Sequence, residues 1–297
     1  MLPHPELDFR RTPVTLLIAA VVVAIELVCT FDEGRRHVYY LLWKMGLLST
    51  IWSGELWQPF TTSLLHGDLI HAAFNTYWLL IFGRVLEPFF GSFRYLLILV
   101  LLAFTSMVPS FLVSNFDAAL DEQIRIVGLS GIVYGLFGIV WMGRQVRQDM
   151  AAVCTEETVS LFIAWFFLCI ILTYAELMNV ANVAHGLGLI VGALIGQALF
   201  EPNRKLLWRS LAVIVSLILL VPTFAAPRHP LYENYLDAVR RHPAPIEMRI
   251  IIEPPKEKNR VREQGSEEGP ANNDHADDGG ASDTGETTRS APSGQTL

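Results

Sequence analysis

Charged residues are scarce in this chain. Asp, Glu, Lys and Arg make up 17% of its 297 residues, whereas hydrophobic residues make up 52%. The mean hydropathy of +0.39 is too high for an average soluble domain of this length. The composition therefore argues against a soluble globular protein and predicts an all-α polytopic membrane protein.

Motifs that hold metals or form disulfide frameworks are also missing. Cys29, Cys154 and Cys169 show no CxxC spacing, and we interpret them as small buried apolar side chains. The His-Glu-x-x-His motif of intramembrane metalloproteases is absent. Asp68 is the only aspartate within an expected span, whereas an aspartyl mechanism needs two. We therefore expect no metal and no other cofactor.

Aromatic residues are missing from the end of the chain, since residues 253–297 contain no Phe, Tyr or Trp. This polar tail cannot bury enough apolar surface to offset the entropy of ordering, so it is predicted to be disordered. Residues 248–252 could form a short strand. The net charge of −7 comes largely from this tail, and we expect no nucleic-acid partner.

Long apolar runs dominate the remainder of the chain, and seven of them have the length of a membrane span. No small-x-small cleavage site follows the first run, so we expect it to be a retained helix and not a signal peptide. The tryptophan-rich stretch 31–60 is expected to lie in the headgroup region. The seven expected spans are 14–30, 63–82, 95–113, 127–143, 159–177, 180–199 and 207–224.

These spans divide the chain into four expected parts. They are an N-terminal segment 1–13, a transmembrane core 14–200, an additional helix 201–226 and the tail 227–297. Basic residues of the short connections alternate so that they can share one side of the membrane, as cytoplasmic loops do. This pattern predicts a cytoplasmic N-terminus and an outside C-terminus in the cell membrane. The basic residues are Arg10, Arg11, Arg84, Arg94, Arg144, Arg147, Arg204, Lys205 and Arg209.

Polar side chains inside spans are functional candidates because they are costly to bury in lipid. His71 and Asn75 are four residues apart and share one helix face, as do Ser130 and Tyr134. His185 begins a face that continues with glycines at four-residue spacing. Glycines on both the fourth and the sixth span would let these helices pack closely and bring His185 to Ser130. An imidazole that takes its proton makes a serine hydroxyl a good nucleophile.

Three motifs occur in order along the chain. They are His66-x4-His71-x3-Asn75, Gly128-Leu129-Ser130-Gly131 and Ala184-His185-x2-Gly188-x3-Gly192. In order and spacing they resemble the signatures of the rhomboid intramembrane serine proteases, over about residues 57–196. The resemblance implies a six-helix transmembrane bundle, here with a C-terminal seventh span, that cleaves transmembrane segments of other proteins within the lipid bilayer.

The resemblance also implies a role for each matching residue. Ser130 would be the nucleophile and His185 the general base of a dyad without a third acid. His71 and Asn75 would supply the oxyanion hole, and Tyr134 would stack on His185 and orient it. Structural roles are implied for His66, Glu87, Gly128, Gly131, Gly188 and Gly192.

The sequence departs from the family pattern at Gln58, where relatives often have arginine. Two other classes of function stay open at this point. A catalytically inactive rhomboid-like protein would bind membrane clients without cutting them, although such relatives typically lack the serine or the histidine. A transporter or channel would line a pathway with the same polar residues. Either would keep its function in Ser130→Ala, whereas a protease would not.

Overall fold

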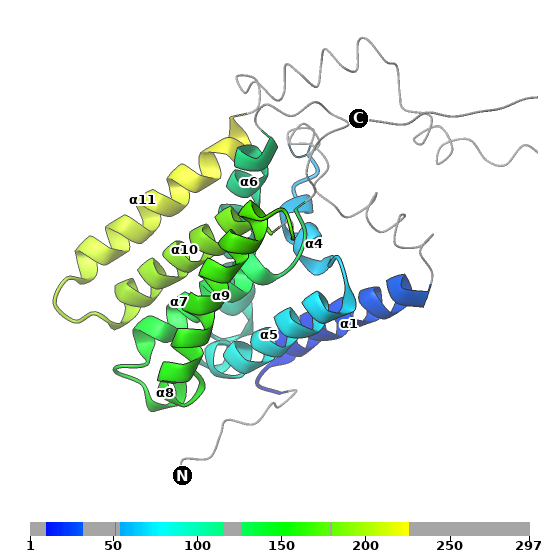
Figure 1. Ribbon diagram of the computed structural model, residues 1–297. Helices are drawn as coiled ribbons and strands as arrows, with labels where there is room; N and C mark the ends of the chain where they lie inside the picture. The colour runs from blue at the N-terminus through cyan, green and yellow to red at the C-terminus, as the bar shows by residue number, and fades with distance from the viewer. Residues whose placement is uncertain (1–9, 32–50, 52–53, 116–125, 179, 226–297) are drawn as a thin grey trace, which may run out of the picture. The chain divides into compact units, whose positions relative to one another are not determined.

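A computed structural model of the chain describes residues 10–31, 51, 54–115, 126–178 and 180–225 (Figure 1). These described residues form helices, without any strand among them. The helices are α1 (Pro13–Phe31), α4 (Gln58–Leu64), α5 (Leu69–Phe90), α6 (Ser92–Asn115), α7 (Ser130–Gly143), α8 (Gln148–Val153), α9 (Glu156–Tyr174), α10 (Asn182–Phe200) and α11 (Lys205–Phe224). The all-helical class expected from the composition is therefore confirmed.

Six of the helices in the described residues are long and apolar enough to cross a membrane: α1, α5, α6, α9, α10 and α11. The fourth expected span, α7, is apolar but has only 14 residues. At 1.5 Å per residue it is about 21 Å long, shorter than the hydrocarbon core of about 30 Å. A helix of this length cannot cross the whole hydrocarbon core, so the Ser130 end of α7 does not extend as far as the end of a full-length span.

The long helices alternate in direction, so their connections gather at two ends of the bundle (Figure 1). One end, here called the basic end, holds the start of α1 and the α5–α6, α7–α9 and α10–α11 connections. Every Lys and Arg in the described residues lies on or near these connections. The opposite end, here called the site end, holds the starts of α5, α7 and α10.

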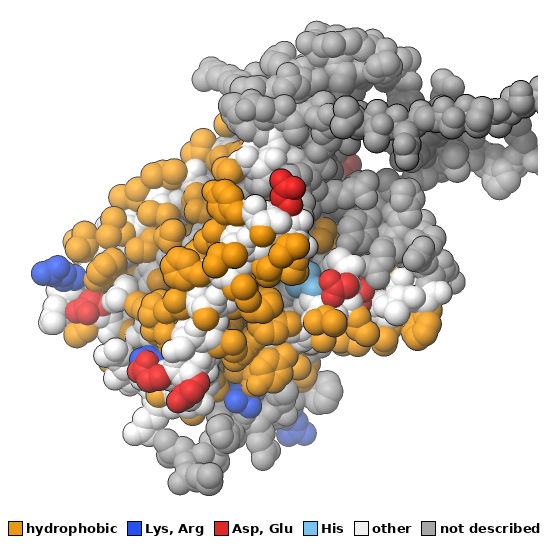
Figure 2. Space-filling view, viewed as in Figure 1, with side chains coloured by type: hydrophobic (Ala, Val, Ile, Leu, Met, Phe, Trp, Pro, Cys, Tyr) orange, Lys and Arg blue, Asp and Glu red, His pale blue; other side chains and the backbone are white. Residues whose placement is uncertain are grey.

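The faces of α9 and α11 are mostly apolar and exposed. In α9 only Val159, Phe162 and Cys169 are buried, and in α11 only Ser216 and Thr223. Figure 2 shows hydrophobic side chains covering much of this face, with Lys and Arg at its margins. Such a surface suits lipid better than water.

A buried carboxylate fastens α1 to α5 at the basic end. Glu87 of α5 accepts hydrogen bonds from Val14 N–H at 2.9 Å, Thr15 N–H at 2.8 Å and the Thr15 hydroxyl at 2.7 Å. Backbone N–H groups in the first turn of a helix have no intrahelical partner, so this carboxylate caps α1. Glu87 thus joins two helices by hydrogen bonds.

The second expected span was wrong in its boundaries. It was placed at residues 63–82, but the helix runs from Leu69 to Phe90. Gly83 and Pro88 fall in the turn expected between the second and third spans, yet both lie inside α5. Gly83 leaves space for the side chain of Thr15, and Pro88 lies in the last turn of the helix. The turn is confined to Gly91, whose φ of +77° favours glycine.

The headgroup loop expected at 31–60 is described only in part, and its last residues belong to a helix. Helix α4 begins at Gln58, and the chain leaves it at Leu65 before α5 begins. The buried Gln58 amide donates a hydrogen bond to the Glu55 carboxylate. The predictions for residues 248–252 and for the tail lie outside the described residues.

Candidate active site

Ser130 is the first residue of α7, after a loop whose shape depends on Gly128. The φ of Gly128 is +110°, a conformation that residues with a Cβ rarely adopt. A Cβ there would also lie 2.8 Å from Cε1 of His71. The loop thus passes directly against the His71 ring and delivers Ser130, which is half-buried, to the site end.

His66 holds the same loop from the other side. The Leu129 N–H donates to Nε2 of His66 at 3.3 Å, and Nδ1 of His66 lies 3.3 Å from the Leu64 carbonyl oxygen. Burial, followed by the influence of His71, lowers the pKa of His66 to about 3. The ring is therefore neutral at physiological pH, so Nε2 can accept from Leu129 while Nδ1–H donates to Leu64.

A second connection ties the loop to α4. The Thr62 hydroxyl donates to the Ile126 carbonyl oxygen at 2.8 Å, and the Gly128 N–H donates to the Thr62 carbonyl oxygen at 3.4 Å. Thr62 itself is buried. Helix α4 thus acts as a brace for the segment before Ser130, a role that sequence reasoning missed because a threonine in an apolar run carries no distinctive signal.

The structure brings His185 to Ser130. Nε2 of His185, on α10, lies 2.7 Å from Oγ of Ser130, a strong hydrogen-bond distance. His185 is buried with only 4% exposure, and its Nδ1 makes no hydrogen bond to any residue that the structure describes. Within the described residues this is a serine–histidine pair without a third acid.

Tyr134 holds the imidazole in place. Its ring stacks on His185 with centroids 4.7 Å apart and an interplanar angle of 23°. The Tyr134 hydroxyl donates to the Phe162 carbonyl oxygen of α9 at 3.1 Å. The ring stack and this hydrogen bond therefore link α7, α9 and α10 around the His185 imidazole, whose Nδ1 has no hydrogen-bond partner in the described chain.

Glycines allow α7 and α10 to approach closely enough for this pair. A Cβ on Gly188 would lie 2.9 Å from the carbonyl carbon of Gly131, and a Cβ on Gly192 would lie 2.6 Å from that of Gly135. Both distances are far too short for real Cβ contacts. The close packing predicted from the glycines of these two spans is therefore present, and α10 packs more extensively against α7 than against any other described helix.

His71 and Asn75 lie one turn apart on α5. The Asp68 carboxylate accepts a hydrogen bond from the His71 N–H at 2.8 Å and thereby caps α5. Asn75 is buried with 1% exposure, and its Nδ2 has no hydrogen-bond partner among the described residues. A buried donor without a partner costs about 1–3 kcal/mol, which makes it a candidate for binding a group that arrives with substrate.

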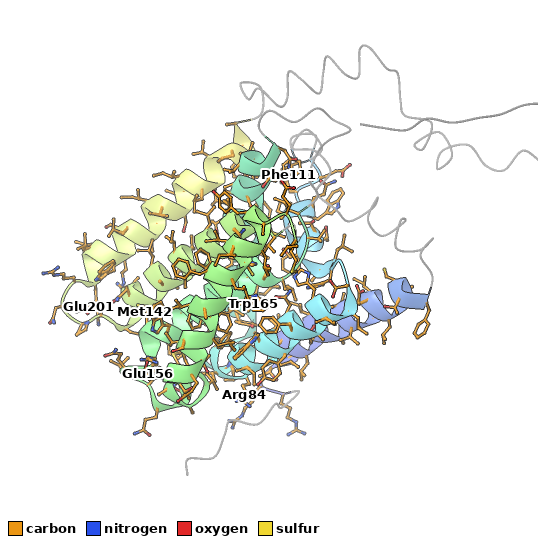
Figure 3. All side chains as sticks on the ribbon, viewed as in Figure 1. Arg84, Phe111, Met142, Glu156, Trp165 and Glu201 are labelled. Atoms are coloured by element: carbon orange, nitrogen blue, oxygen red, sulfur yellow. The ribbon has the colours of Figure 1, made fainter. Side chains whose placement is uncertain are left out.

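The start of α10 is braced by α9. Asn182 lies three residues before His185, and its Nδ2 donates a hydrogen bond to the Thr173 hydroxyl oxygen at 2.8 Å. Nearer the middle of α9, Trp165 (Figure 3) packs on Phe74 of α5 with ring centroids 5.4 Å apart. Asn182 was also missed from the sequence, although its polar side chain at a helix start could have drawn attention.

The described ranges contain no group of three or more His, Cys, Asp or Glu arranged to hold a metal ion. The site contains the hydroxyl of Ser130, which is hydrogen-bonded to the imidazole of His185. The neighbouring helix α5 adds the buried amide of Asn75 and the imidazole of His71. A hydroxyl paired with a base can act as a nucleophile, and fixed donors can stabilise an oxyanion.

Comparison with known proteins matches the amino-acid sequence to one family. The family model described as the rhomboid domain matches residues 53–202, about half of the chain. The chain is 31% identical over 187 residues to rhomboid protease GlpG of Pectobacterium atrosepticum, covering 62% of each chain. It is 27% identical over 190 residues to that of Photorhabdus laumondii, covering 63% of this chain and 62% of the relative. The matched region thus spans less than two thirds of these relatives' length.

Proposed function

Because the chain belongs to the rhomboid family, we propose that it is an intramembrane serine endopeptidase that cleaves transmembrane segments of other proteins. The observation that carries the proposal is the 2.7 Å contact between Nε2 of His185 and Oγ of Ser130. The name of the relatives, rhomboid protease, supports the same activity. The test is cleavage of a single-span substrate reconstituted in the same liposomes, with the Ser130→Ala protein as reference.

The proposed reaction follows from the two side chains. Oγ of Ser130 attacks the carbonyl carbon of the scissile peptide bond while Nε2 of His185 takes the hydroxyl proton. The tetrahedral intermediate collapses, His185 gives that proton to the leaving amine, and an acyl-enzyme remains. His185 then accepts a proton from a water molecule, whose oxygen attacks the ester carbon. When the ester bond breaks, His185 gives this proton to Oγ of Ser130, and the carboxylic acid product leaves.

The depth of Ser130 favours a substrate that lies within the bilayer. Helix α7 is about 9 Å shorter than the hydrocarbon core, so Ser130 lies below the membrane surface if Gly143 is level with the other helix ends. The peptide bonds of a formed helix are shielded, so a susceptible segment must unwind before attack. We propose segments that contain Gly, Ala, Ser or Pro, and a site end that faces outward, because basic connections favour the cytoplasm.

The negative oxygen of the intermediate needs donors that are in place beforehand. We assign this role to the side chains of His71 and Asn75 and to the backbone N–H of Ser130. The support is that Asn75 presents a buried, unpartnered Nδ2 among the described residues, and that His71 lies against Gly128, two residues before Ser130.

Asn75→Ala is expected to slow cleavage about 10- to 1000-fold, the range for loss of one oxyanion donor. The loss should appear in kcat more than in KM, because the oxyanion exists only after attack. The measurement is initial cleavage rates in liposomes over a range of substrate concentrations.

Thr76→Ala is the matched control for this prediction. Thr76 is the next residue of α5, and its buried hydroxyl has no hydrogen-bond partner among the residues that the structure describes. It points about 100° away from Asn75 around the helix. Its rate should remain that of the unmodified protein. Equal rate losses in the two variants would contradict the role given to Asn75.

Removing the ring of Tyr134 is expected to affect chemistry as well as stability. Tyr134→Phe keeps the stack on His185 and loses only the bond to Phe162, about 1 kcal/mol of unfolding free energy. Tyr134→Ala frees the imidazole, and misplacement of a catalytic group costs about 10²-fold in rate. The measurement is kcat together with the thermal unfolding midpoint.

Phe137→Ala separates the two effects. Phe137 is a fully buried ring on the same helix, stacked on Phe162 with centroids 4.3 Å apart. Both alanine variants should lose about 3–5 kcal/mol of stability through the cavity they create. Only Tyr134→Ala should also lose kcat at a temperature where both proteins are folded; a similar kcat loss in Phe137→Ala would contradict an orienting role.

A further inference from the structure

A cavity of about 230 Å³ opens at the basic end of the bundle. Its polar lining comes from Arg11 before α1, Arg84 on α5, and Arg147 and Asp149 around the start of α8. Arg84, labelled in Figure 3, lies 13 residues beyond His71 on α5, which corresponds to about 20 Å along the helix. The cavity is therefore separate from the Ser130 site.

The charges of the lining leave an excess of positive charge. Three arginines and one aspartate give a net charge of +2. Arg147 binds Asp149 through two hydrogen bonds, Nε to Oδ1 at 3.0 Å and Nη2 to Oδ2 at 2.6 Å. The nearby Glu87 carboxylate is already occupied by the first turn of α1.

Arg84 has an unmet hydrogen-bonding capacity. Its Nε is buried and has no hydrogen-bond partner in the described residues, and no carboxylate in those residues forms an ion pair with Arg84 or Arg11. A buried guanidinium donor without a partner is costly, so an oxygen acceptor that enters the cavity would gain binding energy. The guanidinium fork matches the oxygens of phosphate especially well.

The other walls of the cavity are apolar. Val85, Pro88 and Phe89 of α5 line it, and the Arg147 guanidinium lies 4.8 Å from the centroid of the Phe89 ring. A water molecule occupies about 30 Å³ in the liquid, so this volume holds a small group of several atoms. An ionic group attached to a short carbon chain fits both kinds of wall.

We propose that this cavity binds the phosphate group of a net-anionic ligand, through Arg84 and Arg11 with Arg147 as the third cation. Two sources supply that chemistry at a membrane surface: an anionic lipid headgroup and a soluble phosphate. Basic pockets between transmembrane helices are suited to anionic headgroups. The site is independent of whether Ser130 acts as a nucleophile.

The test is native mass spectrometry of the full-length protein in detergent, titrated separately with phosphatidylglycerol, phosphatidylcholine and inorganic phosphate. We expect phosphatidylglycerol to bind more tightly than phosphatidylcholine, whose choline opposes a cationic cavity. Arg84→Gln and Arg11→Gln should each weaken phosphatidylglycerol binding about fivefold, the usual effect of one basic residue near a membrane surface. If inorganic phosphate binds instead, and with the same dependence on Arg84, the site is supported and its source is soluble.

Arg209→Gln is the matched control, because it removes the same charge from an exposed residue of α11 that does not line the cavity. We expect it to leave the affinity unchanged within about twofold. An equal loss in Arg209→Gln and Arg84→Gln would overturn the proposal in favour of general surface attraction, as would equal binding of both lipids. If Arg84→Gln does not fold, the comparison is made with Arg11→Gln, because Arg11 lies outside any helix. An equal loss of affinity in Arg11→Gln and Arg209→Gln would then overturn the proposal.

Discussion

Ser130→Ala is expected to abolish labelling of the purified protein by a fluorophosphonate probe and to lower cleavage by about 10⁴-fold or more. The probe forms a covalent bond to an activated serine oxygen, and Ser130 is the serine whose Oγ lies 2.7 Å from Nε2 of His185. His185→Ala should reduce labelling nearly as far, since the hydroxyl loses the group that takes its proton. The measurement is in-gel fluorescence of detergent-purified protein after a fixed labelling time.

Ser216→Ala supplies the control for this experiment. Ser216 is a buried serine on α11, outside the candidate site. Its labelling should equal that of the unmodified protein. Ser130→Ala should also unfold within a few degrees of the unmodified protein, because one hydrogen bond contributes only about 1 kcal/mol. Undiminished labelling of Ser130→Ala would contradict the proposal that Ser130 is the nucleophile.

Gly192→Ala is expected to separate α7 from α10 and to lower the cleavage rate, although it changes neither Ser130 nor His185. The added Cβ would lie 2.6 Å from the Gly135 carbonyl carbon and closer still to its oxygen, and neither backbone atom can move aside. Overpacking of this kind costs about 1–3 kcal/mol in stability. Because His185 belongs to α10, the distance between its Nε2 and Oγ of Ser130 should increase. The cleavage rate should then fall about 10²-fold or more.

Gly186→Ala tests the same substitution on the same helix where space exists. The nearest atoms to a Cβ at Gly186 belong to the Phe166 ring, at 3.7 and 3.8 Å, which is ordinary contact. Alanine is favoured over glycine in a helix by about 1 kcal/mol, so the unfolding midpoint should hold or rise. The measurement is the thermal unfolding midpoint and the cleavage rate of Gly192→Ala and Gly186→Ala under the same conditions. Similar losses of stability and rate in both variants would contradict the packing argument.

Much of this fold could be predicted because a membrane span is specified by composition over a short window. The errors came from local signals that tertiary contacts override. Gly83 was assigned to a turn, whereas it lies in α5 and leaves space for Thr15 of α1. Likewise, the apolar run of the fourth span contains no indication that its helix begins only at Ser130.

For the candidate site, motif residues were easier to predict than their supports. Ser130 and His185 stood out because polar side chains are rare in apolar runs, and the structure brings them together. The bond from Tyr134 to a carbonyl of α9 was not predictable, since every residue has a carbonyl and only the packing selects Phe162. The arginine cavity was missed because its members are distant in the sequence and each resembles an ordinary loop residue.

The contact between Glu87 and α1 bears on how the chain could be divided. Three hydrogen bonds to one buried carboxylate hold the first turn of α1, and bonds to a charged group contribute about 1.5–3 kcal/mol each. The same helix buries Ile18, Val22 and Ile25 in the bundle core. Helix α1 is thus docked by contacts of its own, and supplied as a separate peptide it should reassemble with a chain that begins at α4.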